Sequence, residues 1–156
     1  MVGLSEEQLI VRRIKDGTVI DHCEPGSALK VLAALGIKEG FTNLVTIAMN
    51  VPSKKLGKKD IIKIADRFLT QSEANRIALI SPRATLNLIK DYRVISKSKV
   101  ELPEAFVNIF RCPNPTCISN SKEPITPEIL VARNEPPRLT CKYCSRFFDV
   151  NELILT

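Results

Sequence analysis

The sequence predicts an α+β protein: a ferredoxin-like domain with an antiparallel sheet, followed by a small zinc-bound β domain. Strand and helix patterns alternate as β-α-β-β-α-β over the first hundred of 156 residues. Four of the five cysteines come after position 100, at the spacing of metal ligands. Residues 1–100 hold 17 Lys and Arg against 10 Asp and Glu, whereas residues 101–156 hold 6 against 7. We therefore expect two domains, 1–100 and 101–156.

The first half of the expected domain contains a strand interrupted by a turn, a helix and a further strand. Residues 9–14 and 18–21 have strand patterns on either side of a turn at 16–17. Residues 27–35 predict a helix with Ser27 as its N-cap and Gly36 just after its end. Residues 43–51 predict a strand with alternate apolar residues on one face: Val45, Ile47, Met49 and Val51.

The second half repeats this order after a lysine-rich loop. A strand is expected over 60–65, a helix over 72–80 capped by Ser72, and a hairpin over 84–89 and 92–97. The segment 96–106 is the expected domain boundary. Beyond it, residues 106–110 and 129–133 predict short strands, and a small core is expected from Phe147, Phe148, Val150, Leu153 and Ile154.

The late cysteines predict one structural Zn²⁺ site per chain. Cys112 and Cys117 form Cys-x4-Cys, and Cys141 and Cys144 form Cys-x2-Cys after a gap of 23 residues. Disulfides are the alternative, but thiols stay reduced in the cytosol. Four thiolates fill the tetrahedral shell of Zn²⁺ and leave no position for a catalytic water. Metal ligation can contribute about 10–16 kcal/mol to the folding of so small a module.

The composition argues against a membrane protein. No apolar run approaches the ~20 residues that span a bilayer. Charged residues at Glu6, Glu7, Arg12 and Arg13 occupy the place where a signal peptide would be apolar. We therefore expect a cytoplasmic protein.

A basic cluster within the first domain allows three interpretations. Lys54, Lys55, Lys58, Lys59 and Lys63 fall within ten residues. They form a solvated surface, a site for a phosphorylated ligand, or a nucleic-acid surface. If 59–63 is extended, Lys59 and Lys63 share the open face of the sheet, about 13 Å apart along the strand.

The main alternative function is a zinc-ribbon nucleic-acid-binding protein. The basic charge supports it, but that charge lies in residues 1–100 and not in the zinc segment. The cluster also lacks interleaved aromatic residues for base stacking. An enzyme is not predicted, since His22 has no nucleophile nearby in sequence and no spaced pair of carboxylates stands out.

The motifs, taken in order, resemble the regulatory chain of aspartate carbamoyltransferase over almost the whole length. They begin with Gly17-Thr-Val-Ile-Asp-His22 and Asn50-Val-Pro-Ser53. They continue through Gly57-Lys-Lys-Asp60, Ile62-Lys-Ile64, Ala84-Thr-Leu-Asn87, Lys97-Ser98 and Leu102-Pro-Glu104. They end with Cys112-Pro-Asn114, Cys117-Ile-Ser119 and Cys141-Lys-Tyr-Cys144.

This resemblance implies a non-catalytic subunit that controls pyrimidine biosynthesis. It implies a homodimer formed through the N-terminal allosteric domain, and a zinc domain that contacts the catalytic chains. It implies CTP, ATP and UTP as effectors.

The resemblance also implies the nucleotide-binding residues: Val11, Ile14, Asp21, His22, Lys59, Lys63, Asn87, Tyr92, Val94 and Lys97. Of these, Asp21, His22, Lys63 and Lys97 match positions near ribose and phosphate. Arg12 and Arg13 depart from the smaller or acidic residues of the family. Lys54 and Lys55 are expected to be solvated.

The resemblance places Asn114, Lys142, Tyr143 and Arg146 on the zinc-domain surface that meets the catalytic chain, and the first three match the family. Arg146 stands where an acidic residue is familiar, so this contact is expected to differ in detail.

Overall fold

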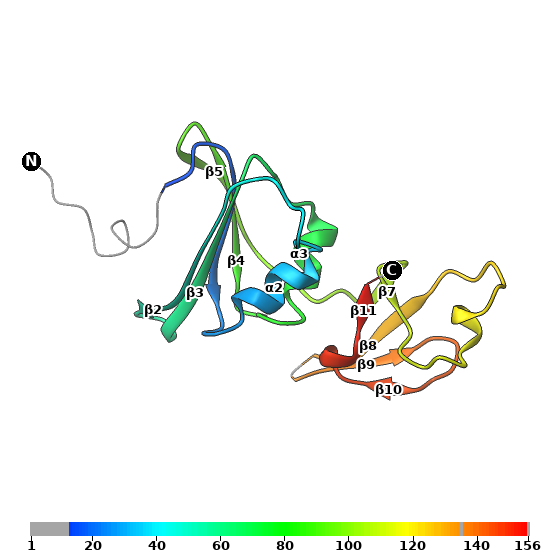
Figure 1. Cartoon of the computed structure of the whole chain (residues 1–156). Helices are drawn as coiled ribbons and strands as arrows, with labels where there is room; N and C mark the ends of the chain where they lie inside the picture. The colour runs from blue at the N-terminus through cyan, green and yellow to red at the C-terminus, as the bar shows by residue number, and fades with distance from the viewer. Residues whose placement is uncertain (1–12, 135, 156) are drawn as a thin grey trace, which may run out of the picture. The chain divides into compact units, whose positions relative to one another are not determined.

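The computed structural model describes residues 13–134 and 136–155, and it divides the chain into two compact units (Figure 1). The first unit reaches to Glu101 and the second begins at Leu102. This division falls within the expected boundary segment 96–106, although the last strand of the first unit extends through Lys99. Each unit is described separately below.

A five-stranded antiparallel sheet forms the first unit. The strand order is β2-β3-β1-β4-β5, which is the ferredoxin-like order with β5 added at one edge. Both helices lie on the same face of this sheet (Figure 1). The α+β fold with antiparallel sheets is thus confirmed. The strands are β1 (Gly17–Cys23), β2 (Val45–Ser53), β3 (Gly57–Ala65), β4 (Thr85–Lys90) and β5 (Arg93–Lys99).

Strand β1 begins at Gly17, where only glycine fits. Its φ is +139°, and a Cβ there would lie 2.1 Å from the Ile64 carbonyl oxygen of the neighbouring strand. Of the strand expected over 9–14, residues 9–12 lie outside the described residues, and Arg13 and Ile14 are not in a strand.

Helix α2 (Ala28–Ala34) follows β1 and ends as the sequence predicts. Gly36 has φ +74°, and the Ile37 and Gly36 N–H groups donate to Leu32 O and Ala33 O, which completes a Schellman motif. Ser27 is the N-cap residue, as expected, but its side chain does not cap the helix. Ser27 Oγ instead bonds to Glu24 O and Ser81 Oγ, and Asp60 Oδ2 accepts from Ala28 N at 2.9 Å.

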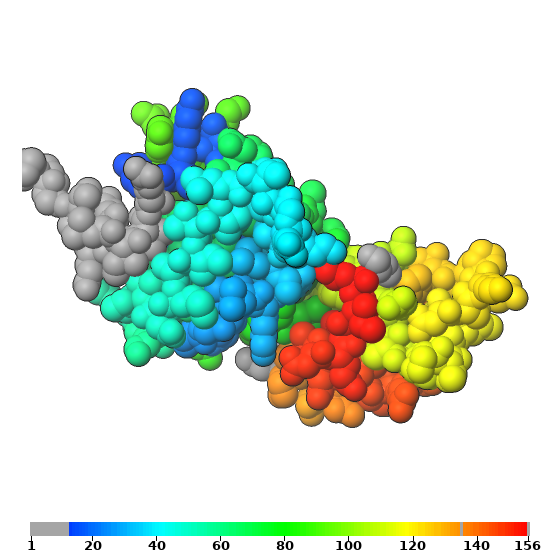
Figure 2. All heavy atoms as spheres, viewed as in Figure 1, coloured from blue at the N-terminus to red at the C-terminus, as the bar shows by residue number. Residues whose placement is uncertain are grey.

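Helix α3 (Gln71–Ile77) has its N-cap at Thr70, two residues before the expected cap, Ser72. Thr70 is extended, its hydroxyl accepts from Glu73 N, and the Glu73 carboxylate accepts from Thr70 N. Because of this capping box, the helix begins after Thr70 and not after Ser72. Both helices have seven residues, and within the described part of the chain no helix could cross a membrane. Figure 2 shows α2 and the segment after it, in light blue to cyan, at the surface of the first unit.

The expected single apolar face of β2 is wrong because the strand is bulged. The register with β3 shifts between Ala48 and Val51, and Asn50 has φ +60°. Ala48 and Val51 are therefore buried together, whereas Ile47 and Met49 are 37% and 41% exposed.

Strand β3 also departs from expectation, because it starts at Gly57 and takes up most of the lysine-rich loop. Ile62 and Ile64 are fully buried, as expected for the face beneath the helices. The opposite face is not open along its whole length. Ile61 is buried with Ala48 and Val51, and Lys59 is only 7% exposed.

The second unit is built from short strands. A sheet of order β10-β9-β8-β6 stands beside the pair β11-β7. Two 3₁₀ turns, η1 (Ile118–Asn120) and η2 (Val150–Glu152), connect them. The strands are β6 (Ala105–Val107), β7 (Phe110–Arg111), β8 (Glu128–Asn134), β9 (Pro137–Cys141), β10 (Phe147–Phe148) and β11 (Ile154–Leu155).

The core of the second unit differs from the expected one. Phe148 is buried, but Phe147 and Ile154 are 54% and 43% exposed. Strands β6 to β9 supply the other buried side chains, and the rings of Phe106 and Phe110 meet edge to face with centroids 5.2 Å apart. The buried apolar set is Phe106, Phe110, Ile129, Leu139 and Phe148.

Candidate functional site

Three of the expected nucleotide-binding residues lie in one row across the first sheet. Antiparallel pairing sets Lys63 opposite Val19, Val19 opposite Asn87, and Asn87 opposite Lys97. Directly opposed residues point to the same face of a sheet. Lys63 and Lys97 are thus three strand spacings apart, about 14–15 Å. The row lies on the face opposite the helices, since its neighbours Ile62 and Ile64 are buried beneath them.

Asp21 and Lys59 form an ion pair at the end of this face. Lys59 Nζ lies 3.0 Å from Asp21 Oδ1 and 3.3 Å from Oδ2, and both side chains are mostly buried. The backbone N–H of His22 also donates to Asp21 Oδ1, at 2.6 Å. Asp21 therefore neutralises Lys59 and fixes the end of β1.

His22 lies next to this pair in an unusual backbone conformation, with φ +57°. Burial lowers its pKa, and the positive charges of Lys59, Lys55 and Lys97 lower it further against the opposing effect of Asp21. The imidazole is therefore neutral at pH 7. Its Nδ1 lies 3.1 Å from the hydroxyl oxygen of Thr85.

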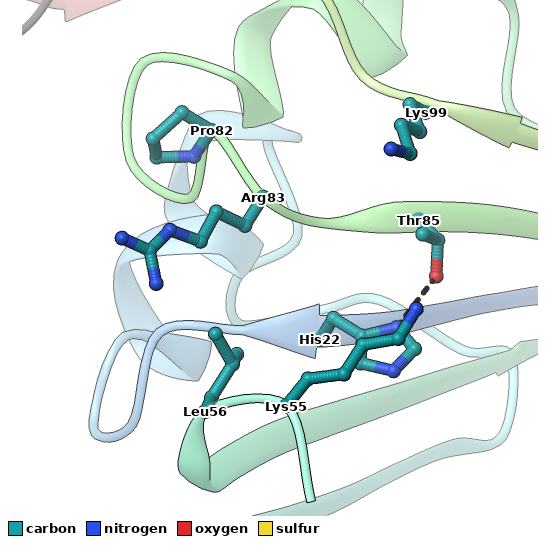
Figure 3. A pocket seen from close by; sticks show the side chains of 7 residues that line it. All are labelled: His22, Lys55, Leu56, Pro82, Arg83, Thr85 and Lys99. Carbon is teal, nitrogen blue, oxygen red and sulfur yellow. Dashed lines mark hydrogen bonds between the residues drawn. The ribbon is translucent and has the colours of Figure 1, made fainter. Parts of the chain in front are cut away.

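A pocket of about 370 Å³ opens beside His22 (Figure 3). The figure shows the Lys55 side chain reaching towards the His22–Thr85 hydrogen bond, and the Lys99 amine directed into the space beside Thr85. Arg83 extends at another side of the pocket. Among the described residues no carboxylate lines the pocket, and those that line it are His22, Lys55, Leu56, Pro82, Arg83, Thr85 and Lys99.

The pocket lies on the same face of the sheet as the row of Lys63, Asn87 and Lys97. Thr85 pairs with Asp21 on one side and with Lys99 on the other. Thr85 and Lys99 are each two residues from Asn87 and Lys97, so they point to the same face. Lys55, expected to be solvated, lines this pocket.

The remaining expected nucleotide residues gather at the other end of β4. Tyr92 and Val94 lie at the β4–β5 hairpin and are 53% and 58% exposed, whereas Ile14 is buried. The Tyr92 N–H donates to Lys15 O at 2.9 Å, which holds the hairpin against the segment after Ile14. Val11 lies outside the described residues.

The four late cysteines converge in the second unit. Their sulfur atoms all lie within 4.8 Å of one another. Cys112 Sγ lies 3.8 Å from Cys144 Sγ, and Cys117 Sγ lies 3.7 Å from Cys141 Sγ. These separations exceed a disulfide bond and match the edge of a tetrahedron with ~2.3 Å metal–sulfur bonds, about 3.8 Å. The four thiols are free, so the donor set fits a tetrahedral metal ion.

The local environments of these thiols shift their pKa values in different directions. Burial raises the pKa of Cys112 and of Cys141. Burial acts in the same direction on Cys144, but the Arg146 N–H and the Asn114 side chain favour its thiolate and lower its pKa to about 7. A metal ion that binds all four thiolates must therefore displace protons, which makes its affinity depend on pH.

The expected partner-contacting residues surround the cysteine loops. Asn114 accepts hydrogen bonds from the backbone and hydroxyl of Thr116. Lys142 Nζ lies 2.9 Å from Glu128 Oε2, and the Tyr143 hydroxyl donates to Thr126 O at 2.8 Å. Arg146 is exposed, and its carbonyl accepts from Cys141 N.

Sequence reasoning missed several residues of the pocket beside His22 and of the cysteine cluster. Lys99 and Arg83 line the pocket, yet they come from separate segments with no local motif. Asn120 donates to the carbonyls of Cys112 and Asn114, at 2.8 and 2.7 Å, and so holds the first cysteine loop. Its position within the gap between the cysteine pairs was the only available signal.

Comparisons with known proteins agree on both units. The family model described as aspartate carbamoyltransferase regulatory chain, allosteric domain, matches residues 9–101. The model described as its metal binding domain matches residues 104–154. Relatives with the name aspartate carbamoyltransferase regulatory chain include one from Cenarchaeum symbiosum, 52% identical over 98% of this chain and 100% of its own.

Two further relatives carry the same name. The protein from Nitrosopumilus maritimus is 49% identical over 96% of this chain and 98% of its own, and that from Pyrobaculum islandicum is 51% identical over 94% and 98%. The chain therefore belongs to the aspartate carbamoyltransferase regulatory chains, a family of non-catalytic subunits with an allosteric domain and a metal-binding domain.

Proposed function

We propose that the first unit binds nucleotide effectors, CTP, ATP and UTP, and that their occupancy controls the catalytic chains of aspartate carbamoyltransferase. The observation that carries this proposal is the cross-strand row of Lys63, Asn87 and Lys97, continued by the basic pocket at Thr85 and Lys99. A charged triphosphate needs several cationic donors, each worth about 1.5–3 kcal/mol as a charge-assisted hydrogen bond.

The nucleotide lies along β4 in this proposal. Its phosphates occupy the end with Thr85 and Lys99, and its base occupies the hairpin end with Tyr92 and Val94. The ribose then lies over Asn87, between the two lysines of the row. The strand spans about 16 Å between these ends, at ~3.3 Å per residue.

The metal of the second unit is Zn²⁺ in this proposal, at one structural site per chain. Four thiolates at tetrahedral spacing suit Zn²⁺, which is stable with a closed sulfur shell. The site has a structural role, because the fourth thiolate takes the place that a catalytic zinc keeps for water. The four cysteines that bind the metal hold their loops in place. Beside these loops lie the residues that contact the catalytic chain in this proposal, Asn114, Lys142, Tyr143 and Arg146.

The regulatory chains pair through the first unit. Both edges of its sheet carry exposed apolar side chains, Ile47 and Met49 on β2, and Val94 and Ile95 on β5. An exposed strand edge with apolar residues is suited to pairing with a second copy.

The effector signal requires a difference in affinity between two quaternary states. A nucleotide that binds both states equally changes nothing, however tightly it binds. A coupling of about 1–3 kcal/mol would change the affinity for substrate about 5- to 150-fold. Effectors of opposite sign compete for one site and differ in which state they favour.

Replacing Lys63 with Ala tests the site. We expect CTP affinity to fall about tenfold or more, since one charge-assisted contact is lost, while metal content and assembly with catalytic chains stay unchanged. Calorimetry measures the affinity. Lys58→Ala is the matched control, because Lys58 is an exposed lysine of the same strand outside the row. Equal effects of the two variants would contradict the proposed site.

A further inference from the structure

One residue of the second unit binds the backbone of the first cysteine loop, residues 112–117, at both ends. Asn120 is the last residue of the turn η1, and its N–H donates to Cys117 O at 2.9 Å. Its side-chain Nδ2 donates to Cys112 O at 2.8 Å and to Asn114 O at 2.7 Å. The carbonyl groups of both cysteines of the first pair therefore accept hydrogen bonds from Asn120.

Asn114 connects these contacts with the second cysteine pair. Its carbonyl oxygen accepts from Cys117 N as well as from Asn120. Its backbone N–H forms a hydrogen bond with the Cys112 thiol, and its side chain forms one with the Cys144 thiol. A shift of Asn114 would therefore change the position of groups that contact a thiol of each pair.

A pocket of about 310 Å³ borders the same loop. Of the four late cysteines, Cys112 alone is among the described residues that line it, which are Arg111, Cys112, Pro113, Pro115, Asn120 and Ile154. A loop that borders a cavity has few packing contacts on that side. The position of Cys112 therefore depends strongly on the hydrogen bonds that the loop accepts.

The Asn120 side chain directs its donors to this loop. Both described hydrogen bonds of its Nδ2 end on loop carbonyls. Its Oδ1 is buried without a hydrogen-bond partner in the part of the chain that the structure describes. A buried acceptor without a partner destabilises a fold. The value of this side chain therefore lies in its two donated hydrogen bonds.

We propose that Asn120 is a positioning residue for the metal ion, which fixes the backbone of Cys112 and Cys117 so that both thiolates reach the metal at tetrahedral spacing. The inference rests on the proposed Zn²⁺ site and adds a residue that is not itself a ligand. Replacing a group that orients metal ligands lowers metal affinity by about 10- to 100-fold. Without the Asn120 amide, the Cys112 end of the loop loses its hold and moves away from the other thiolates.

Competition with a chelator, on the full-length reduced chain, measures the affinity for Zn²⁺. We expect Asn120→Ala to weaken it about 10- to 100-fold. Asn120→Asp should weaken it at least as much, because a carboxylate of the same shape offers no donor to the two carbonyl oxygens. Equal affinities of the wild-type chain and Asn120→Ala would overturn the inference. The absence of Zn²⁺ binding by the wild-type chain would overturn the metal site as well.

Ser121→Ala is the matched control. The Ser121 hydroxyl donates to Ile118 O at 2.6 Å, within the turn η1 and outside the first cysteine loop. This variant should keep the wild-type affinity for Zn²⁺. A loss as large as that of Asn120→Ala would contradict a specific role of the Asn120 amide.

Co²⁺ distinguishes positioning of the ligands from a general loss of stability, because its absorption bands depend on the geometry of the thiolates around it. At saturating CoCl₂, the bands of Asn120→Ala should differ in position or intensity from those of the wild-type chain, since the Cys112 thiolate is displaced. Bands identical to those of the wild-type chain, with only the affinity reduced, would assign Asn120 to folding alone and overturn the positioning role.

Discussion

At the scale of single residues, the lysines of the first unit lie in two different environments. Lys59 is buried and paired with Asp21, so much of its charge is balanced within the protein. Lys55 and Lys99 line a pocket that has no carboxylate among its described lining residues. A bound anion would therefore interact most strongly with the second group, while the Asp21–Lys59 pair keeps the end of β1 in place beneath it.

We expect His22 to couple nucleotide binding to protonation. Its pKa is lowered in the free chain by burial and by neighbouring lysines, and a nearby phosphate should raise it. Between these two pKa values, binding takes up a proton, so this contribution strengthens affinity as the pH falls through the pKa of the bound state. Calorimetry of CTP binding at pH ~6.5, in buffers of different ionisation enthalpy, measures the uptake. His22→Asn should take up fewer protons, and equal uptake would contradict this role.

Single residues also show why the sequence located only part of this site. Lys63 and Lys97 could be assigned because they lie in ordered motifs that resemble a known family. Lys55 sits in a run of lysines, and such runs are mostly solvated. It lines one pocket with Thr85, thirty positions away, and this placement comes from the register of β1 with β4 and the fold of the β2–β3 turn.

At the scale of elements, long-range contacts replaced the expected helix cap and strand face. The Asp60 carboxylate serves α2 as an N-terminal acceptor from a neighbouring strand and also binds the bulge of β2 at Asn50. Local patterns do not reveal a capping group that is 32 positions from the helix. The end of α2 was predictable, because Gly36 needs only its own positive φ.

Helix α3 should depend on Thr70 and not on Ser72. Thr70→Ala removes the hydroxyl that accepts from Glu73 N and should lower the free energy of unfolding by about 1 kcal/mol. Ser72→Ala should change it much less. Denaturant unfolding of the two variants compares them, and a larger loss for Ser72→Ala would place the cap where the sequence alone suggested.

The same capping box predicts a dependence on acid. Burial acts to raise the pKa of Glu73, but hydrogen bonds from Thr70 and the contact with Arg67 outweigh it and lower the pKa. A lowered carboxyl pKa stabilises the fold above the unfolded value of about 4.3, and that contribution is lost as pH falls through the folded value. The stability difference between the wild-type chain and the Glu73→Gln variant should therefore shrink in acid unfolding experiments. A difference that stays constant into acid would contradict this role of the carboxylate.

At the scale of the whole molecule, the two units depend on different sources of stability. The first unit buries a continuous set of apolar side chains between its sheet and helices. The second unit has few buried apolar residues and gathers four thiols at one point. Its fold should therefore depend on the metal far more than the first unit does.

Replacing Cys117 with Ser tests this difference. We expect the second unit to lose its metal and its structure, and the chain to stop binding catalytic chains, while nucleotide binding by the first unit persists. Metal analysis, calorimetry and gel filtration with catalytic chains measure the three outcomes. Cys23→Ala removes the fifth, buried thiol and should retain the metal. Normal assembly of Cys117→Ser would contradict a metal-dependent contact surface.

The most direct test of the whole account is an aspartate saturation curve of the cognate catalytic chains. It should be recorded alone, with this chain, and with this chain plus CTP or ATP. The account predicts that the chain changes the curve, that nucleotides shift it further, and that Lys63→Ala assembles but needs a higher nucleotide concentration for the same shift. An assembled, metal-loaded complex whose curve no nucleotide changes would contradict control through the first unit.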